Sequence, residues 1–232
     1  MNRSCHDTMA AAAPPLIPLE SLAHASPAAR GLALERLHRE VAECRRCVDA
    51  GFIPEAHPIF RGRVGNRVMV LGQAPGALTH ERPMPYMGAT GRLLERWLTA
   101  AGFPPGTLHE RFYLTSVTKC FPGSSLSGKG DRAPGGRELA LCGAHLDREL
   151  ALVRPELVIT LGRLAAMALV GPATLTALVG SIREGTRAGH RFLVLPLPHP
   201  SGVSRWMNDP ANQLRHRAAL ALLSDERVRH GL

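Results

Sequence analysis

Residues 67–94 read RVMVLGQAPGALTHERPMPYMGATGRLL, and the rest of the chain is interpreted around this stretch. A short buried strand is predicted over Arg67–Leu71, because its last four residues form an unbroken apolar run. A glycine-rich turn at Gly72–Gly76 follows at once, and a second turn at Pro85–Gly88 precedes a helix that begins at about Gly91. Open α/β sheets bind ligands beyond the carboxyl ends of their strands, so the stretch is expected to form the floor and one wall of an active site.

Strands and helices are expected to alternate along the remainder of the chain. Further strands are predicted at Phe112–Thr118, Pro155–Leu161 and Arg191–Leu195. Helices are predicted at Leu19–Cys44 with a break at Pro27, Gly91–Ala101, Arg137–Val153, Arg163–Val170 and Asn212 to about Leu223. This order predicts an α/β fold with three layers, α/β/α, around a mainly parallel central sheet of about four strands.

The length of 232 residues fits a single α/β domain. The domain is expected to span residues 19–232, after a disordered tail at residues 1–18. The chain has no apolar run of about 18 residues, so no membrane-spanning helix is expected. Prolines interrupt the apolar part of the N-terminus, which therefore lacks a convincing signal peptide. We expect a cytoplasmic monomer.

The charge balance is strongly basic, with 28 Lys and Arg against 19 Asp and Glu, a formal net charge of +9 and a pI near 10.3. One interpretation is a solvated, arginine-rich surface. The other is a polyanionic partner, because neutralisation of phosphates supplies most non-specific affinity for nucleic acids. Charge alone leaves both open.

Four cysteines are spaced as a metal site would require if the fold brings them together. Cys44 and Cys47 form a C-x2-C pair, Cys120 follows a predicted strand, and Cys142 lies within a predicted helix. Four thiolates suit zinc or an iron–sulfur cluster equally well. Spacing alone therefore indicates a metal without identifying it, and Cys5 in the presumed tail is left over.

Three blocks of sequence together resemble the uracil-DNA glycosylase superfamily, most closely its iron–sulfur (family 4) enzymes. The first block is GQAPG at 72–76 with PYMGATGRLL at 85–94, similar to the family's GEAPG and P-F-V-G blocks and its A-G-x-L-L helix start. The second is YLTSVTKC at 113–120 with RPELVITLG at 154–162, and the third is HPS at 199–201. The resemblance runs from about Cys44 to Leu223.

The resemblance implies a resident [4Fe–4S] cluster, with zinc as the alternative that spacing left open. The family's four cysteine ligands fall, in order, on Cys44, Cys47, Cys120 and Cys142. The cluster is expected to be structural and to brace the loops that contact DNA.

The same resemblance implies a pocket for a base that has left the duplex stack. Tyr86, where the family has Phe, is expected to stack on the base, and the backbone of Gly72 and Ala74 to face its edge. His199 is expected to donate to a uracil carbonyl oxygen as negative charge develops there. Gln73, placed with His199 among the catalytic residues, stands where family 4 has Glu and instead matches the G-Q-x-P of family 1. No carboxylate is visible in this turn.

Ser116 is the other departure, because the family has Asn there to read the Watson–Crick edge of uracil. A serine hydroxyl rotates to suit either a donor or an acceptor. Either another group reads the base, or the pocket accepts a wider set of deaminated or damaged bases.

DNA contacts are expected from the segment after the histidine motif and from the end of the second strand. Ser201 and Arg205 are candidates for this role, and Lys119 is a candidate phosphate contact. Trp206 has two interpretations: it wedges into DNA, or it packs on the body of the protein and anchors the loop.

The function implied is a monofunctional DNA glycosylase that removes uracil, or a related deaminated base, from DNA of either strandedness and leaves an abasic site. A catalytically weak DNA- or lesion-binding module is the alternative, motivated by Ser116 and the missing carboxylate. A third interpretation is a zinc-stabilised nucleic-acid-binding protein that shares only the fold.

Overall fold

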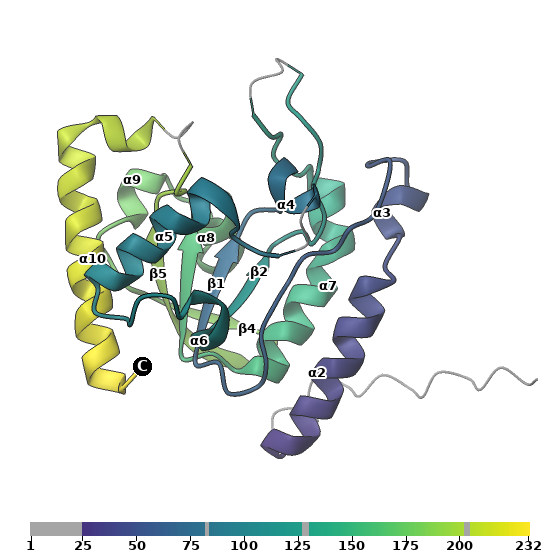
Figure 1. The fold of residues 1–232 in the computed structure, drawn as a ribbon, viewed down its shortest axis with the longest axis horizontal. Coiled ribbons are helices and arrows are strands. Elements are labelled where there is room, and N and C mark those ends of the chain that lie inside the picture. The colour runs from purple at the N-terminus through teal and green to yellow at the C-terminus, as the bar shows by residue number, and fades with distance from the viewer. Residues whose placement is uncertain (1–24, 82–83, 127–129, 202–204) are drawn as a thin grey trace, which may run out of the picture.

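A computed structural model describes residues 25–81, 84–126, 130–201 and 205–232 (Figure 1). Its centre is one five-stranded sheet in the order β2-β1-β3-β5-β4. The strands are β1 (Val68–Gly72), β2 (Phe112–Ser116), β3 (Leu157–Leu161), β4 (Arg183–Arg187) and β5 (His190–Leu197). Four of them are parallel, and β4 alone runs antiparallel to its neighbour. The α/β class and the mainly parallel sheet are confirmed.

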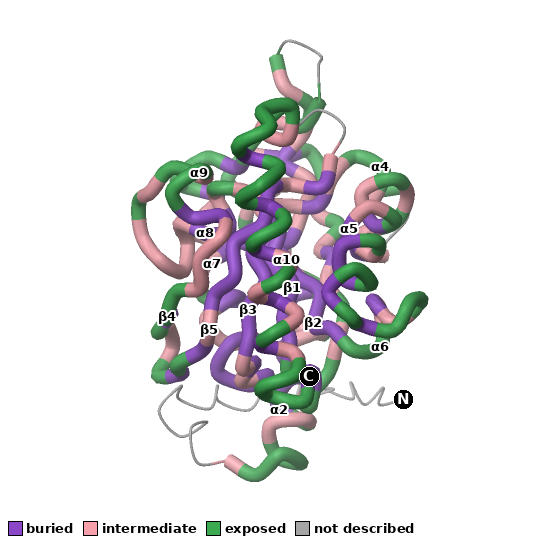
Figure 2. The backbone as a smooth tube through the Cα atoms, turned by 90° about the vertical axis from the view of Figure 1, so that its left-hand side faces the viewer, coloured by how far each residue is buried: buried purple, intermediate pink, exposed green. Residues whose placement is uncertain are grey.

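Helices cover both faces of the sheet and complete the three layers. One face carries α5 (Gly88–Ala100) and α10 (Pro210–His230), and the other carries α7 (Gly136–Val153) and α8 (Arg163–Val170). The helix α2 (Pro27–Ala42) packs on the outside of α7. Figure 2 shows the strands buried between helices whose outer surfaces are exposed. Strands covered on both faces are expected to be buried and largely apolar, as β1 and β3 are, with Thr160 the one polar side chain in them.

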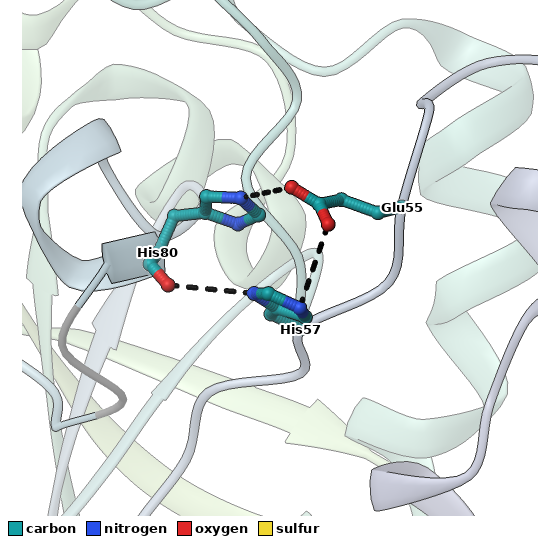
Figure 3. Close-up of side chains that lie close together, drawn as sticks. All are labelled: Glu55, His57 and His80. Atoms are coloured by element: carbon teal, nitrogen blue, oxygen red, sulfur yellow. Dashed lines mark hydrogen bonds and ion pairs between the residues drawn. The ribbon is translucent and has the colours of Figure 1, made fainter.

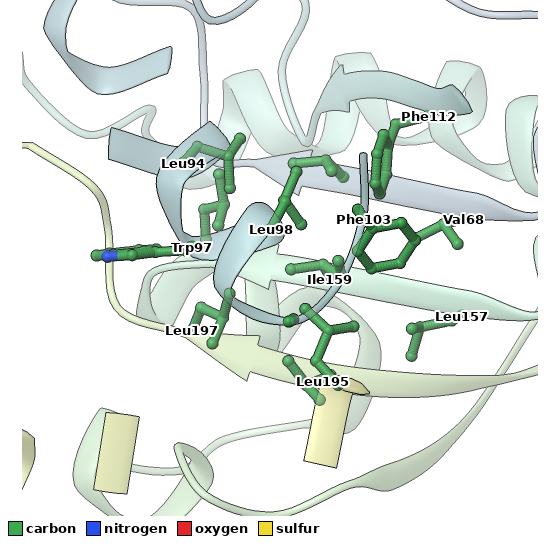
Figure 4. Close-up of a cluster of buried hydrophobic side chains, with 14 of the residues drawn as sticks. Val68, Leu94, Trp97, Leu98, Phe103, Phe112, Leu157, Ile159, Leu195 and Leu197 are labelled. Atoms are coloured by element: carbon green, nitrogen blue, oxygen red, sulfur yellow. The ribbon is translucent and has the colours of Figure 1, made fainter. Parts of the chain in front are cut away.

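The core under α5 fixes the helix that begins at the predicted site. Leu94 and Leu98 of α5 lie in one buried cluster with Ile159 and Leu195 of the sheet (Figure 4), and the Trp97 ring of the same helix packs against His216 of α10. Leu94 is fully buried and Leu98 is 2% exposed, so this face of the helix is excluded from water. Burial of a leucine side chain stabilises a fold by roughly 1.5–3 kcal/mol. The start of α5 is therefore held against a rigid layer.

Prolines begin two of the predicted helices. Pro27, where the predicted helix is expected to break, begins α2, and Ser26 caps its first turn by accepting a hydrogen bond from the Ala29 N–H at 3.2 Å. Pro210 likewise begins α10 behind the Asp209 cap, and the helix continues to His230, beyond the predicted end near Leu223. The tail predicted at residues 1–18 and the start predicted at Leu19 lie outside the described residues.

The strand β4 was not predicted from the sequence. Only Gly185 of its five residues is buried, so the segment REGTR lacks an apolar pattern. It pairs with β5 through a tight turn at Ala188 and Gly189, which both have positive φ. The short elements α3 (Arg46–Asp49), α4 (Ala77–Glu81), α6 (Leu108–Arg111), α9 (Leu175–Leu178) and η1 (Trp206–Asn208) complete the described fold.

The order of the strands places a binding site beyond the carboxyl end of β1. The chain passes from β1 to β2 on one side and then to β3 on the other, so the order reverses at β1. Such a reversal opens a crevice at the carboxyl edge of an α/β sheet. Within the described residues, none of the helices combines the length and the apolar character that a membrane span requires.

Candidate functional site

A cavity of about 490 Å³ opens at the carboxyl edge of β1 and β2. This volume is typical of pockets that take small organic groups. Most of the residues predicted to act on the base line it, namely Gln73, Ala74, Tyr86, Ser116 and His199, together with the predicted DNA contact Ser201. The structure therefore brings together side chains from three segments that are far apart in the sequence.

Gly72 ends β1 directly before Gln73 and Ala74, which line the cavity. It pairs in register with Ser116 of the neighbouring strand. A Cβ on Gly72 would lie 2.8 Å from the hydroxyl of Tyr86 and 3.1 Å from that of Ser116. Any side chain at this position would fill the space above the strand ends, where the two hydroxyls converge.

Tyr86 is held in an uncommon backbone conformation, with a φ of 56°. Two contacts enforce it. The His109 ring nitrogen Nε2 bonds the Pro85 carbonyl at 2.8 Å, and a Cβ on Gly91 would lie only 1.5 Å from the Tyr86 carbonyl oxygen. Gly91 is therefore required for the close approach of the second turn to α5.

The Tyr86 hydroxyl is buried and has no hydrogen-bond partner among the described residues. Burial raises the pKa of this phenol well above its ordinary value, so it remains a neutral hydroxyl near pH 7. An unpaired buried hydroxyl costs about 1–3 kcal/mol, which a bound ligand can recover.

The glycine-rich turn is tied to the end of β2 by its own backbone. The Gly72 carbonyl accepts from the Val117 N–H at 2.9 Å, and the Gln73 carbonyl accepts from the Thr118 N–H at 3.1 Å. The turn is thus fixed without its side chains, which leaves the Gln73 side chain at the cavity wall.

His199 follows β5 and reaches the cavity through a tight turn, in which its carbonyl accepts from the Ser201 N–H at 2.9 Å. Burial lowers the pKa of its imidazole below the ordinary value, and the Asp131 carboxylate acts in the opposite direction. The ring is therefore neutral near pH 7 and can donate one hydrogen bond.

Asp131 is a site residue that the sequence did not reveal. It lines the same cavity as His199 and is the one acidic residue among the described residues that do so. Its loop is rich in glycine and serine, and such loop charges are usually solvated, so no local pattern marks it. Only the folded chain brings its carboxylate against Gly76, the last residue of the glycine-rich turn.

The four predicted cysteine ligands line one small cavity of their own. Cys44 lies just after α2, Cys47 in α3, Cys120 just after β2, and Cys142 in α7, where it is 8% exposed. Apolar side chains such as Val41 and Ile53 close the surroundings. The donor set is thus entirely sulfur in a largely dry site, which fits a soft metal or an iron–sulfur cluster.

Backbone donors at this cavity agree with that fit, although burial alone favours neutral thiols. Burial, followed by the neighbouring thiol of Cys142, raises the pKa of Cys47 to about 11 and that of Cys120 to about 12. The Lys119 N–H donates to the Cys142 sulfur at 3.3 Å, and the His57 N–H donates to Cys120. N–H donors of this kind stabilise thiolates that bind metal.

Lys119 corrects one prediction, because it is 1% exposed and not a phosphate contact. Its ammonium bonds Glu149 at 2.7 Å, the Ser116 carbonyl at 2.6 Å and the Thr115 hydroxyl at 2.9 Å. The sequence places it in a strand end of a basic protein, which does not distinguish buried from exposed lysine. These contacts join the cavity at the carboxyl edge of β1 and β2 to the segment that bears Cys120.

The two predicted DNA-contacting residues after the histidine motif differ in exposure. Arg205 is exposed. Trp206 packs against the core and donates from Nε1 to the Thr176 hydroxyl at 3.0 Å, so of its two interpretations the anchor is the one observed. Asn212 of α10 also donates to the Trp206 carbonyl, at 3.0 Å.

A second polar cluster, Glu55, His57 and His80, joins the segment before β1 to α4 (Figure 3). The His80 Nε2 bonds Glu55 at 2.7 Å, and the two imidazoles stack with centroids 4.4 Å apart. His57 also bonds the His80 carbonyl at 3.4 Å. These contacts steady α4 beside the cavity, since the neighbouring Thr79 lines it.

Comparison with known proteins agrees with this geometry. The chain is 28% identical to the type-4 uracil-DNA glycosylase of Archaeoglobus fulgidus over 179 residues, which cover 73% of this chain and 82% of the relative. It is 29% identical to the type-4 uracil-DNA glycosylase of Pyrobaculum aerophilum over 177 residues, 74% of this chain and 85% of the relative. It is 27% identical to the type-4 uracil-DNA glycosylase of Thermotoga maritima over 159 residues, 68% of this chain and 74% of the relative.

The similarity extends to a family description as well as to individual relatives. The model of the uracil DNA glycosylase superfamily matches residues 60–223, which include β1, the glycine-rich turn and the histidine motif. A match of this extent, together with the cavity at the end of β1, places the protein: the chain belongs to the uracil-DNA glycosylase superfamily.

Proposed function

We propose that this protein hydrolyses the N-glycosidic bond of uracil, or of a related deaminated base, in DNA and leaves an abasic site for base excision repair. The observation that carries the proposal is the cavity that Tyr86, Ser116 and His199 line together beside the glycine-rich turn. Its volume, about 490 Å³, is sufficient for a base and part of its sugar. The names of the relatives support the same activity.

Two hydroxyls replace the single amide that the resemblance implies for base recognition. Tyr86 brings a hydroxyl where the family has Phe, and Ser116 is smaller than the family's Asn, so both hydroxyls fit above Gly72. Each can donate or accept, unlike an amide with fixed ends. The pocket therefore accepts uracil and also tolerates deaminated purines such as hypoxanthine.

His199 stabilises the departing base. Its neutral imidazole, kept neutral by burial, donates to a carbonyl oxygen of the base as negative charge develops there. Tyr86 supplies a ring face on which the base stacks, and Gln73 presents a neutral amide at the cavity wall.

Cys44, Cys47, Cys120 and Cys142 hold a [4Fe–4S] cluster in this proposal, and zinc is the alternative to test against it. The cluster supplies a structural brace and no redox step. The segments that it joins are the end of α2, the start of the loop after β2 and α7.

DNA is the partner proposed, and the exposed Arg205 and the cavity-lining Ser201 lie where a backbone would pass. The formal net charge of +9 favours a polyanion. The protein acts as a monomer on this proposal.

Incubation with oligonucleotides that contain uracil, hypoxanthine or only normal bases, followed by alkaline cleavage, tests the function. We expect strand breaks with uracil, weaker cleavage with hypoxanthine and none with the normal sequence. Binding of uracil-DNA without cleavage of any substrate would contradict the proposal and favour a lesion-binding module.

A further inference from the structure

Base release from a nucleotide needs a negative group beside the sugar. As the C1′–N1 bond lengthens, positive charge develops at C1′ and the ring oxygen, and the attacking water must lose a proton. The turn after β1 offers Gln73 and Ala74, neither of which is an acid. The charge must therefore come from elsewhere in the fold.

Asp131 supplies a carboxylate at this place from the loop between β2 and α7. It is the one acid among the described residues that line the cavity. Its Oδ2 lies 2.8 Å from the point that a Cβ on Gly76 would occupy, so the carboxylate packs against the backbone of the glycine-rich turn. The same carboxylate acts electrostatically on His199, which approaches from β5.

The backbone around Asp131 is fixed by its neighbour. Arg132 forms a two-pronged ion pair with Glu138 of α7 at 2.7 and 2.8 Å and donates to the Phe52 carbonyl at 3.1 Å. The Arg132 N–H also donates to the Gly123 carbonyl at 3.0 Å. Bidentate arginine–carboxylate pairs are strong and directional, so Arg132 is a positioning residue for the acid beside it.

We propose that Asp131 is the catalytic carboxylate of this glycosylase, an inference that rests on the proposed function. The C1′–N1 bond breaks and its electron pair leaves with the base, while the water oxygen forms a bond to C1′. Asp131 accepts one proton of that water and stabilises the cationic sugar by its charge. The departing base anion, held by His199, takes up a proton from solvent.

Three variants test the role of Asp131 by single-turnover base release from uracil-DNA. Asp131→Asn keeps the size of the side chain and removes its charge, and we expect its rate to fall by about 10²–10⁴-fold. Asp131→Glu recovers part of the loss. The control is Asp225→Asn, a change at an exposed aspartate of α10, which leaves the rate unchanged.

A second readout separates catalysis from a merely structural effect. DNA with a cationic pyrrolidine abasic mimic resembles the charged sugar, and DNA with neutral tetrahydrofuran does not. Wild type binds the cationic DNA more tightly, and Asp131→Asn loses most of that preference. A variant whose rate stays within about threefold of wild type, or whose preference survives a fall in rate, overturns the assignment.

The two proposals fail in different ways. If wild type releases no base from any substrate, the proposed function fails, and the mimic preference still reports on Asp131 alone. If wild type is active while Asp131→Asn matches the Asp225→Asn control, only the role of Asp131 is lost.

Discussion

On the proposed function, Tyr86 and Ser116 together set which base the cavity accepts. Their hydroxyls converge on the space above Gly72, and that of Tyr86 has no partner among the described residues. A buried hydroxyl without a partner raises the affinity for a ligand that forms a hydrogen bond with it and lowers the affinity for one that does not. Base preference is thus decided by groups that each switch between donor and acceptor.

Tyr86→Phe tests this interpretation, because it keeps the ring and removes the hydroxyl. We expect kcat/KM on uracil-DNA to fall by about 5- to 50-fold, which corresponds to the loss of one hydrogen bond in a buried site. The ratio of uracil to hypoxanthine cleavage should change as well, as measured on matched oligonucleotides. Equal loss on both substrates would mean that the hydroxyl supports the turn and does not read the base.

The sequence was sufficient to assign the residues whose chemistry lies in a local motif. Gln73, Tyr86, Ser116 and His199 were predicted in the site, and all line the cavity. Asp131 was not predicted as a site residue, because it lies between glycine and arginine in a polar loop, where acids are usually solvated. Lys119 was misassigned because strand position alone does not report burial.

At the scale of elements, the end of β2 couples the base cavity to the cysteine cavity. Lys119 bonds the Ser116 carbonyl on one side, and its own N–H donates to the Cys142 sulfur on the other. Glu149 of α7 completes the network from within the opposite layer. A substitution of Lys119 or Glu149 is therefore expected to perturb both cavities.

Removal of one partner should destabilise the fold strongly. Glu149→Gln leaves the Lys119 ammonium buried without its counterion, and we expect a loss of about 3–5 kcal/mol. The exposed ion pair of Arg191 and Glu184 is the control, since Glu184→Gln should cost about 1 kcal/mol or less. Melting midpoints compare the two variants, and equal shifts would contradict a structural role for the buried pair.

Element boundaries show what a local pattern reveals and what it hides. The apolar runs of β1 and β3 were predicted because both faces of these strands are covered. The edge strand β4 was not, because four of its five residues are not buried and only its pairing with β5 defines it. The far end of α10 was missed for a similar reason, as it is rich in exposed arginine and histidine.

At the scale of the whole molecule, the fold assembles four thiols that spacing could not identify as one site. They come from the segment before α3, from α3 itself, from the segment after β2 and from α7, and they line one cavity. No local motif contains more than two of them. The identity proposed for the metal, an iron–sulfur cluster, rests on the resemblance.

Cys120→Ser tests the metal site. Purified wild type is expected to be brown, with about four iron and four sulfide per chain, and the variant to lose both colour and iron. Cys5, which lies outside the described residues and outside the predicted ligand set, provides a control, since Cys5→Ser should retain the colour. Stoichiometric zinc in place of iron in the wild type, from an anaerobic preparation, would contradict the cluster.

Acid should weaken the packing of α2 on the sheet. Burial, and then the charge of Lys119, lowers the pKa of His38 from 6.5 to about 4, while its ring bonds the Tyr113 hydroxyl at 2.9 Å. Between about pH 6.5 and about pH 4, the His38 imidazole is therefore protonated in the unfolded chain and neutral in the folded chain. Stability from this group is complete above that pH and declines as the pH falls towards about 4.

The matched comparison is His38→Gln, which cannot titrate. The melting midpoint of wild type should fall more steeply than that of the variant between about pH 7 and about pH 5. Parallel curves would show that other groups account for the acid sensitivity.

The central claim is that the cavity at the end of β1 releases uracil from DNA with the help of His199. The most direct test is mass-spectrometric detection of free uracil after single-turnover reaction with uracil-DNA. We predict one uracil for each abasic site with wild type and a rate about 10²–10³-fold lower with His199→Ala, which should still bind the DNA. Absence of free uracil with wild type, or an unchanged rate with His199→Ala, would contradict it.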